Sequence, residues 1–167
     1  MKRLNVLIAS FVFLMLQMLV APRIALGEIS PDFPLLLVAY FAIHQTPVRG
    51  SISGFVVGLI QDLFNPQLLG LNALTKSVAG YAVSVTGAKA DPDNDLFLLA
   101  LFSITALGHD FVYLLIFTGL DPGKFFMLLL TVSIPSSIYT AVVGVIVHRI
   151  AVVLGTKGVR TFGKARP

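Results

Sequence analysis

Residues 50–81 read GSISGFVVGLIQDLFNPQLLGLNALTKSVAGY, and they carry the clearest indication of the protein's architecture. An apolar segment, Val48–Phe64, ends at Asn65-Pro66, and a second one, Leu68–Thr86, follows at once. An Asn-Pro pair is a turn signal, and apolar segments of this length are typical of helices that cross a bilayer. The stretch therefore predicts a helical hairpin inside a membrane.

The composition of the whole chain also indicates a membrane protein. Of its 167 residues, 56% are hydrophobic and only 12% are charged, whereas a soluble domain carries roughly 25% charged residues. The mean hydropathy is +0.91. These values argue against a soluble enzyme and, despite the net charge of +4, against a nucleic-acid partner. The lack of cysteine excludes a disulfide scaffold and thiolate metal sites.

Six apolar stretches along the chain predict an all-α integral membrane protein, because only helices satisfy the backbone of such segments in lipid. They are Leu4–Val20, Ile29–Ile43, Val48–Phe64, Leu68–Thr86, Leu96–Thr118 and Phe125–Ile150. We interpret Pro135 as a kink in one long helix, not as a break between two crossings. The predicted architecture is a six-transmembrane-helix bundle over residues 1–154 and a short basic cytoplasmic tail over residues 155–167.

Two alternatives concern the beginning of the chain. The uninterrupted apolar run Phe33–Ile43 is short for a span and is compatible with a re-entrant hairpin. That hairpin would place Arg49 near the bilayer centre at high cost, so a full crossing is favoured. Met1–Gly27 has features of a cleaved signal peptide, but its apolar run is long and no clean A-x-A site follows, so a retained helix is favoured.

Lysine and arginine predict the orientation. With both termini cytoplasmic, the outer side carries only Arg23 and Lys124, while the inner side carries nine basic residues. These are Lys2, Arg3, Arg49, Lys89, Arg149, Lys157, Arg160, Lys164 and Arg166. Because basic residues accumulate in cytoplasmic loops, we expect a multi-pass protein with both termini in the cytoplasm.

Charged residues inside the predicted spans mark a candidate polar site, because an isolated charge in lipid is costly. Lys76 and Asp110 both lie about 12 Å below the outer ends of their helices, and Asp62 lies above them. We expect Lys76 to pair with one of these two carboxylates. His109 adjoins Asp110 but points about 100° around the helix and need not share the site. The pair either fixes helix register or belongs to a polar cavity or partner-contact site that opens outward.

A glycine-spaced face on the third stretch is the candidate packing or partner face. Gly50, Gly54 and Gly58 recur every four residues, and Ser53 is expected to form a hydrogen bond across the groove that they line. The face meets either another helix of the same chain or a helix of a partner subunit. Replacement of Gly54 or Gly58 by leucine is expected to be disruptive, and replacement by alanine mild.

Catalytic and cofactor motifs are missing from the sequence. It contains no G-x-S-x-G, no H-E-x-x-H and no phosphate-binding glycine loop. Asp62 and Asp110 formally permit an aspartyl-protease dyad, but their predicted depths separate them. We therefore expect no enzymatic activity, no catalytic residue, no metal and no cofactor.

The quoted stretch resembles the MreD family, small integral membrane proteins of the bacterial rod-shape system. A glycine-spaced helix closes on Gly58-Leu59-x-x-Asp62, a loop leads to Gly70-Leu71-Asn72-Ala73-Leu74, and the next helix carries Gly80-Tyr81. The segment Pro31-Asp32-Phe33-Pro34, the chain length and the six-span layout are also similar to the family.

The resemblance implies a non-enzymatic scaffold or adaptor of the cell-elongation and peptidoglycan-synthesis machinery in the bacterial inner membrane. Members work with MreC and, indirectly, with the transpeptidase, the RodA glycosyltransferase and MreB filaments, surrounded by membrane lipid. The family fold is similar to that of the S-components of energy-coupling-factor transporters. The alternative function is therefore a substrate-binding subunit of a vitamin transporter.

Overall fold

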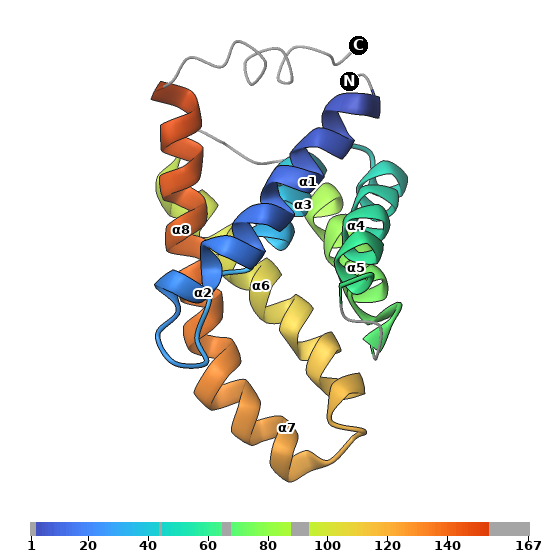
Figure 1. Ribbon diagram of the computed structural model, residues 1–167, viewed down its shortest axis with the longest axis vertical. Helices are drawn as coiled ribbons and strands as arrows, with labels where there is room; N and C mark the ends of the chain where they lie inside the picture. Colours follow the sequence, from blue (N-terminus) through green and yellow to red (C-terminus); the bar gives the residue numbers. More distant parts are fainter. Residues whose placement is uncertain (1–2, 44, 65–67, 88–93, 154–167) are drawn as a thin grey trace.

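All regular structure in the described part of the chain is helical, as the sequence predicts. The computed structural model describes residues 3–43, 45–64, 68–87 and 94–153. Beyond the helices, these ranges contain one isolated β-bridge, between Leu26 and Ile29. The helices (Figure 1) are α1 (Arg3–Leu19), α2 (Ala21–Ile24), α3 (Phe33–Ile43), α4 (Pro47–Asp62), α5 (Leu71–Thr86), α6 (Asp95–Phe117), α7 (Pro122–Leu128), the π-helical turn η3 (Leu129–Ser133) and α8 (Ile134–Val153).

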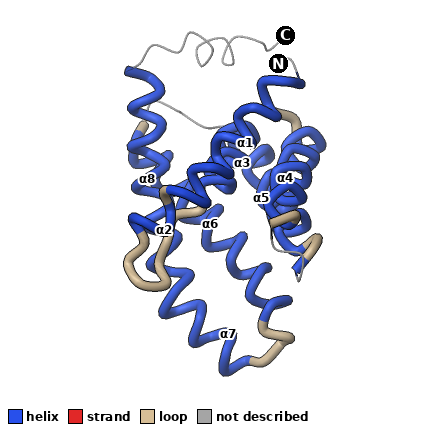
Figure 2. The backbone as a smooth tube through the Cα atoms, viewed as in Figure 1, coloured by secondary structure: helices blue, strands red, loops and turns tan. Residues whose placement is uncertain are grey.

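Helix α3 lies at the centre of the fold. Ten of its eleven residues are buried, and helices α1, α4, α5, α6 and α8 pack around it (Figure 2). A helix that is apolar on every side is typical of such a central position. At 1.5 Å per residue α3 is only about 16 Å long, shorter than the roughly 30 Å of a hydrocarbon core. Its neighbours, and not lipid, therefore cover most of its surface.

Two helical segments are long and apolar enough to cross a membrane. They are Asp95–Phe117 and Pro122–Ile150, and only 22% and 28% of their most apolar windows are buried within the protein. A core helix of a soluble protein would be mostly buried. Large apolar side chains such as Phe11, Phe55 and Ile138 are exposed elsewhere on the surface. These surfaces suit contact with lipid.

The last helix is continuous, as predicted from Pro135, but it contains a π-turn. In η3 the N–H of Ile134 donates to the carbonyl oxygen of Leu129, five residues earlier. Proline lacks an N–H and crowds the carbonyl of the preceding turn. The wider π-turn directly before Pro135 relieves this conflict while the helix continues through α8.

The start of the first helix, α1, and the end of the last helix, α8, lie on the same side of the fold. In Figure 1 the first turn of α1 and the last turn of α8 are both at the upper end, and the turn between α6 and α7 is at the lower end. At the upper end Arg149 Nη2 and Asp95 Oδ1 are 2.7 Å apart. The predicted tail at 155–167 lies outside the described residues, as do Lys2 and Lys89.

Candidate functional site

The candidate site is built on the first turn of α3. The N–H of Phe33 donates to Gln17 Oε1 (2.9 Å), and Pro34 has no N–H. The N–H of Leu35 donates to Asp32 Oδ1 at 2.8 Å. Asp32 therefore acts as the N-cap of α3, and its own N–H donates to Thr140 Oγ1 on α8 (3.1 Å). The Pro-Asp-Phe-Pro sequence thus starts a buried helix without leaving a first-turn N–H unpaired.

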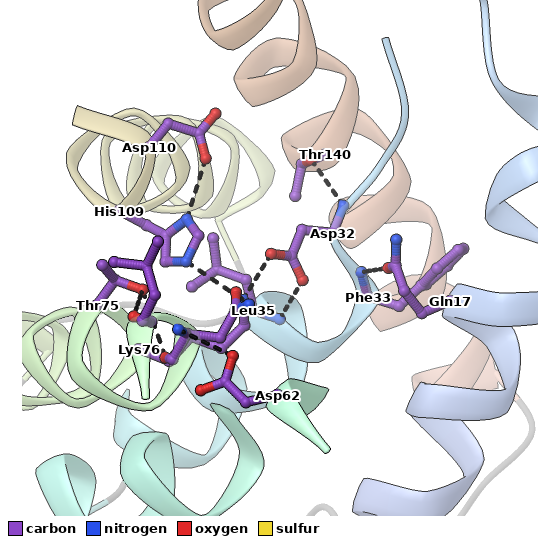
Figure 3. Close-up of polar contacts among 12 residues, drawn as sticks. Gln17, Asp32, Phe33, Leu35, Asp62, Thr75, Lys76, His109, Asp110 and Thr140 are labelled. Atoms are coloured by element: carbon purple, nitrogen blue, oxygen red, sulfur yellow. Dashed lines mark hydrogen bonds and ion pairs between the residues drawn. The ribbon is translucent and has the colours of Figure 1, made fainter. Parts of the chain in front are cut away.

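Lys76, on α5, pairs with Asp32. The Lys76 side chain is fully buried, and its Nζ lies 2.8 Å from Asp32 Oδ2. The expectation that Asp62 and Asp110 are the only carboxylates within reach of Lys76 is therefore wrong. Asp32 lies near the start of the predicted stretch Ile29–Ile43, and in the fold the first turn of α3 lies beside α5 (Figure 3).

The Lys76 ammonium has two further partners. It donates to Asn72 Oδ1 at 3.3 Å, one turn earlier on α5, and it lies 3.2 Å from His109 Nε2 on α6. These contacts use the three N–H donors of the ammonium. Sequence reasoning missed Asn72, although its position four residues before Lys76 places both on one helix face.

His109 joins the site and links Lys76 to Asp110. Its Nδ1 lies 3.0 Å from Asp110 Oδ1, and its side chain is buried (Figure 3). The structure therefore brings Lys76, His109 and Asp110 together, but Asp110 contacts Lys76 through the imidazole and not directly. The sequence leaves open whether His109 shares the site, and the structure places it there, because the long lysine side chain reaches the ring.

Asp62 has a different role from the one expected. It is fully buried, and its carboxylate accepts hydrogen bonds from the backbone N–H groups of Gly70 (2.9 Å), Asn72 (3.2 Å) and Ala73 (3.0 Å). These groups belong to the first turn of α5 and the residue before it. Asp62 thus caps α5 from the end of α4, where a negative charge is favourable.

A cavity of about 370 Å³ adjoins this network. Its wall is formed by helices α1, α4 and α6, by the residue before α3 and by the first turn of α5. Its polar lining consists of Gln17, Asp32, Gln61, Asn72, His109, Asp110 and Tyr113, and its apolar lining of Leu14, Met18 and Phe64. The network therefore forms one wall of a polar cavity. The sequence left two arrangements open, a pair that only fixes helix register and a pair that belongs to such a cavity.

The glycine face of α4 is covered by α5 of the same chain. A Cβ on Gly54 would overlap the carbonyl of Lys76, and a Cβ on Gly58 would overlap that of Asn72. On the same face Gly50 lies against Gly80. The two backbones are in direct contact, which requires glycine at these positions.

Ser53 does not bond across this groove. Its Oγ donates to Gln45 Oε1 (3.0 Å), close to the start of α4. Ser51 forms the bond across the interface instead, with 2.8 Å between its Oγ and that of Ser77. Ser53, one residue before Gly54, points about 100° away from the glycine face of α4. Ser51, three residues before Gly54, points only about 60° away from it.

The described ranges contain no group of three or more His, Cys, Asp or Glu side chains that could hold a metal ion.

The helical fold, the exposed apolar surfaces and the buried polar network define a class: an α-helical integral membrane protein with polar groups enclosed between its helices. Residues 2–157 match the family model described as rod shape-determining protein MreD. The chain therefore belongs to the MreD family of rod shape-determining membrane proteins. Comparisons with curated proteins and with solved structures give no match.

Proposed function

We propose that the protein is a non-enzymatic scaffold of the bacterial cell-elongation machinery, acting as an adaptor for MreC and the transpeptidase complex. The single observation that carries this proposal is the family match over residues 2–157. RodA and MreB filaments are its indirect partners, and its place is the inner membrane.

The helical arrangement supports a multi-pass topology with six crossings. The proposed crossings are α1, the stretch Ile29–Ile43 that ends in α3, then α4, α5, α6 and the continuous α7–α8 segment. The first turn of α1 and the last turn of α8 lie on the same side of the fold, as an even number of crossings requires (Figure 1). Positive charge in the sequence assigns this side to the cytoplasm.

The outer surface of the helices supports an adaptor role. Phe55 and Leu59 on α4 and Ile104 and Phe111 on α6 are exposed. Apolar surfaces of this kind contact either lipid or the transmembrane helix of a partner. An adaptor needs such helix faces and no catalytic group.

A second candidate function is a substrate-binding subunit of a small-molecule transporter. The observation that favours it is the polar cavity of about 370 Å³. A solute site is usually a cavity with a few well-placed polar groups, and this cavity has them.

Affinity purification from native membranes in mild detergent distinguishes the two functions. The adaptor proposal expects MreC and a transpeptidase among the co-purifying proteins. Recovery of an ATPase-coupled permease without MreC would overturn it in favour of the transporter subunit. A Gly54→Leu variant, which forces α4 away from α5, is the matched control for loss of the native fold.

A further inference from the structure

The hydrogen bonds of the buried network determine the protonation of His109. A lysine ammonium has only donors, so His109 Nε2 must accept from Lys76 Nζ. The ring proton then resides on Nδ1 and is donated to Asp110 Oδ1, 3.0 Å away. In this arrangement the imidazole is neutral, and it links a cation on one side to an anion on the other.

The ionised groups of this network do not balance. Lys76 carries one positive charge, and Asp32 and Asp110 carry one negative charge each. Lys76 is already paired with Asp32 at 2.8 Å. Asp110 receives only the hydrogen bond from neutral His109, and its side chain is 28% exposed. One carboxylate on the cavity wall is therefore not neutralised by a cation among the described residues.

Gln61, a residue of α4 that lines the cavity, carries an unused acceptor. Gln61 Oε1 is buried, and no donor among the described residues lies within hydrogen-bonding distance of it. A buried acceptor without a partner is costly, and one that lines a cavity is satisfied when a donor enters. Asp110 Oδ2 and Gln61 Oε1 are thus two acceptors of the lining residues that receive no hydrogen bond from the described part of the chain.

The remaining wall suits an organic cation. Tyr113 lines the cavity and is stacked between two rings, with centroid distances of 6.0 Å to His109 and 5.7 Å to Phe117. At the cavity wall Met18 is 40% exposed and Phe64 is 53% exposed. The charge attracts a cation, and the exposed apolar side chains suit a carrier that also has an apolar part.

We infer that this cavity binds a primary ammonium group, which donates hydrogen bonds to Asp110 and to Gln61, whose buried Oε1 turns toward the cavity when the ammonium enters. A quaternary ammonium has no N–H and leaves both acceptors unsatisfied. The carrier of the ammonium is either the headgroup of an aminophospholipid or a free amine. The apolar residues at the wall favour the aminophospholipid, because its acyl chains remain in the membrane while the headgroup enters the cavity.

Binding of defined lipids to the purified full-length chain tests this inference. The delipidated protein in detergent is titrated with phosphatidylethanolamine and with phosphatidylcholine of identical acyl chains, and binding is followed by native mass spectrometry. We expect phosphatidylethanolamine to bind at least about tenfold more tightly. In a separate arm, ethanolamine is added alone and the thermal unfolding temperature is measured.

The two sources give different patterns. Preference for phosphatidylethanolamine with no effect of free ethanolamine supports the lipid headgroup. Stabilisation by ethanolamine without a preference between the lipids supports a free amine. Equal binding of both lipids together with no effect of ethanolamine overturns the inference.

Two variants test the acceptors. Asp110→Asn keeps the shape of the side chain but removes the charge, and Gln61→Ala removes an acceptor that no described residue uses. We expect each to reduce the preference for the primary amine by about tenfold or more. The control is Asp121→Asn, whose exposed carboxylate caps α7 outside the cavity. Unchanged amine binding by a folded Gln61→Ala and a folded Asp110→Asn overturns the inference. Recovery of MreC is a separate measurement, so this result leaves the adaptor proposal standing.

Discussion

Asp32 and Lys76 are 44 positions apart in the chain, yet Lys76 Nζ lies 2.8 Å from Asp32 Oδ2. The same carboxylate accepts the N–H of Leu35 and so begins α3. One side chain thus couples the start of the central helix to the buried cation of α5. The position of α3 and the charge of Lys76 are therefore interdependent.

The buried pair predicts a non-additive response to mutation. Lys76→Ala leaves Asp32 unpaired and is expected to reduce the free energy of unfolding by about 3–5 kcal/mol. The double variant Lys76→Ala with Asp32→Asn removes both charges and is expected to lose less than the single variant. Thermal unfolding in one detergent measures both effects.

The control for this prediction is Lys124→Ala. Lys124 is 74% exposed, and its Nζ lies 3.6 Å from Asp121 Oδ2. An exposed pair of this kind contributes roughly 0–1 kcal/mol. If Lys76→Ala were as harmless as Lys124→Ala, the pairing of Lys76 with Asp32 would not stabilise the fold. A folded double variant that fails to maintain rod shape would assign the polar network a role beyond stability.

The contact between α4 and α5 predicts that even alanine is disruptive at Gly54. Its added Cβ would overlap the carbonyl of Lys76, and a backbone atom cannot move aside as a flexible side chain can. We expect Gly54→Ala to lower the free energy of unfolding by at least the ~1–3 kcal/mol of an overpacked core. The sequence alone predicts a mild effect, because it does not show how closely the helices approach.

Gly108→Ala is the matched control for Gly54→Ala. Gly108 is also inside a helix, and a Cβ there would meet no atom within 4 Å. Alanine in an open helical position is favourable by up to about 1 kcal/mol relative to glycine. Equal thermal stability of the two variants would show that α4 and α5 do not pack as closely as described.

Much of the helical architecture follows from hydropathy. The predicted stretches Leu4–Val20, Val48–Phe64 and Leu96–Thr118 differ from α1, α4 and α6 by one or two residues at each end. Long apolar runs bounded by turn residues specify such helices locally.

The partners within the polar network depend on tertiary packing, and the sequence could not specify them. Depth along a helix places Lys76 and Asp110 at the same level, but it says nothing about which helix lies beside α5. In the fold the first turn of α3 lies there, so Asp32 pairs with Lys76. Similarly, the sequence makes Asp62 a candidate partner of Lys76, but in the fold its carboxylate accepts hydrogen bonds from the backbone at the start of α5.

The orientation of the helices predicts the location of three reporter fusions. Fusions at Lys89 and at Pro167 are expected to report a cytoplasmic location, and a fusion at Pro122 an external one. The reason is the excess of basic residues on one side and the placement of the ends of α1 and α8 at the same end of the fold. An external reporter at Pro167 would require an odd number of crossings and would contradict the six-crossing topology.

Asp62 predicts a local effect at the start of α5. Asp62→Ala leaves the N–H groups of Gly70, Asn72 and Ala73 without their carboxylate acceptor in a buried position. Loss of hydrogen bonds to a charged group costs about 1.5–3 kcal/mol for each, although the three share one side chain and are not additive. Asp62→Asn keeps one acceptor oxygen but loses the charge that favours a helix N-terminus, so its effect should be intermediate.

Hydrogen exchange measures this effect at the amides themselves. We expect the amides of Asn72 and Ala73 to exchange faster in Asp62→Ala, while those in the middle of α6 remain protected. Asn94→Ala is the control, because Asn94 caps α6 in an exposed position through Leu96 and Phe97. Loss of that exposed cap costs only about 1 kcal/mol. Exchange at Asn72 and Ala73 that is equally slow in Asp62→Ala and in the unmodified protein would mean that α5 begins without its cap from α4.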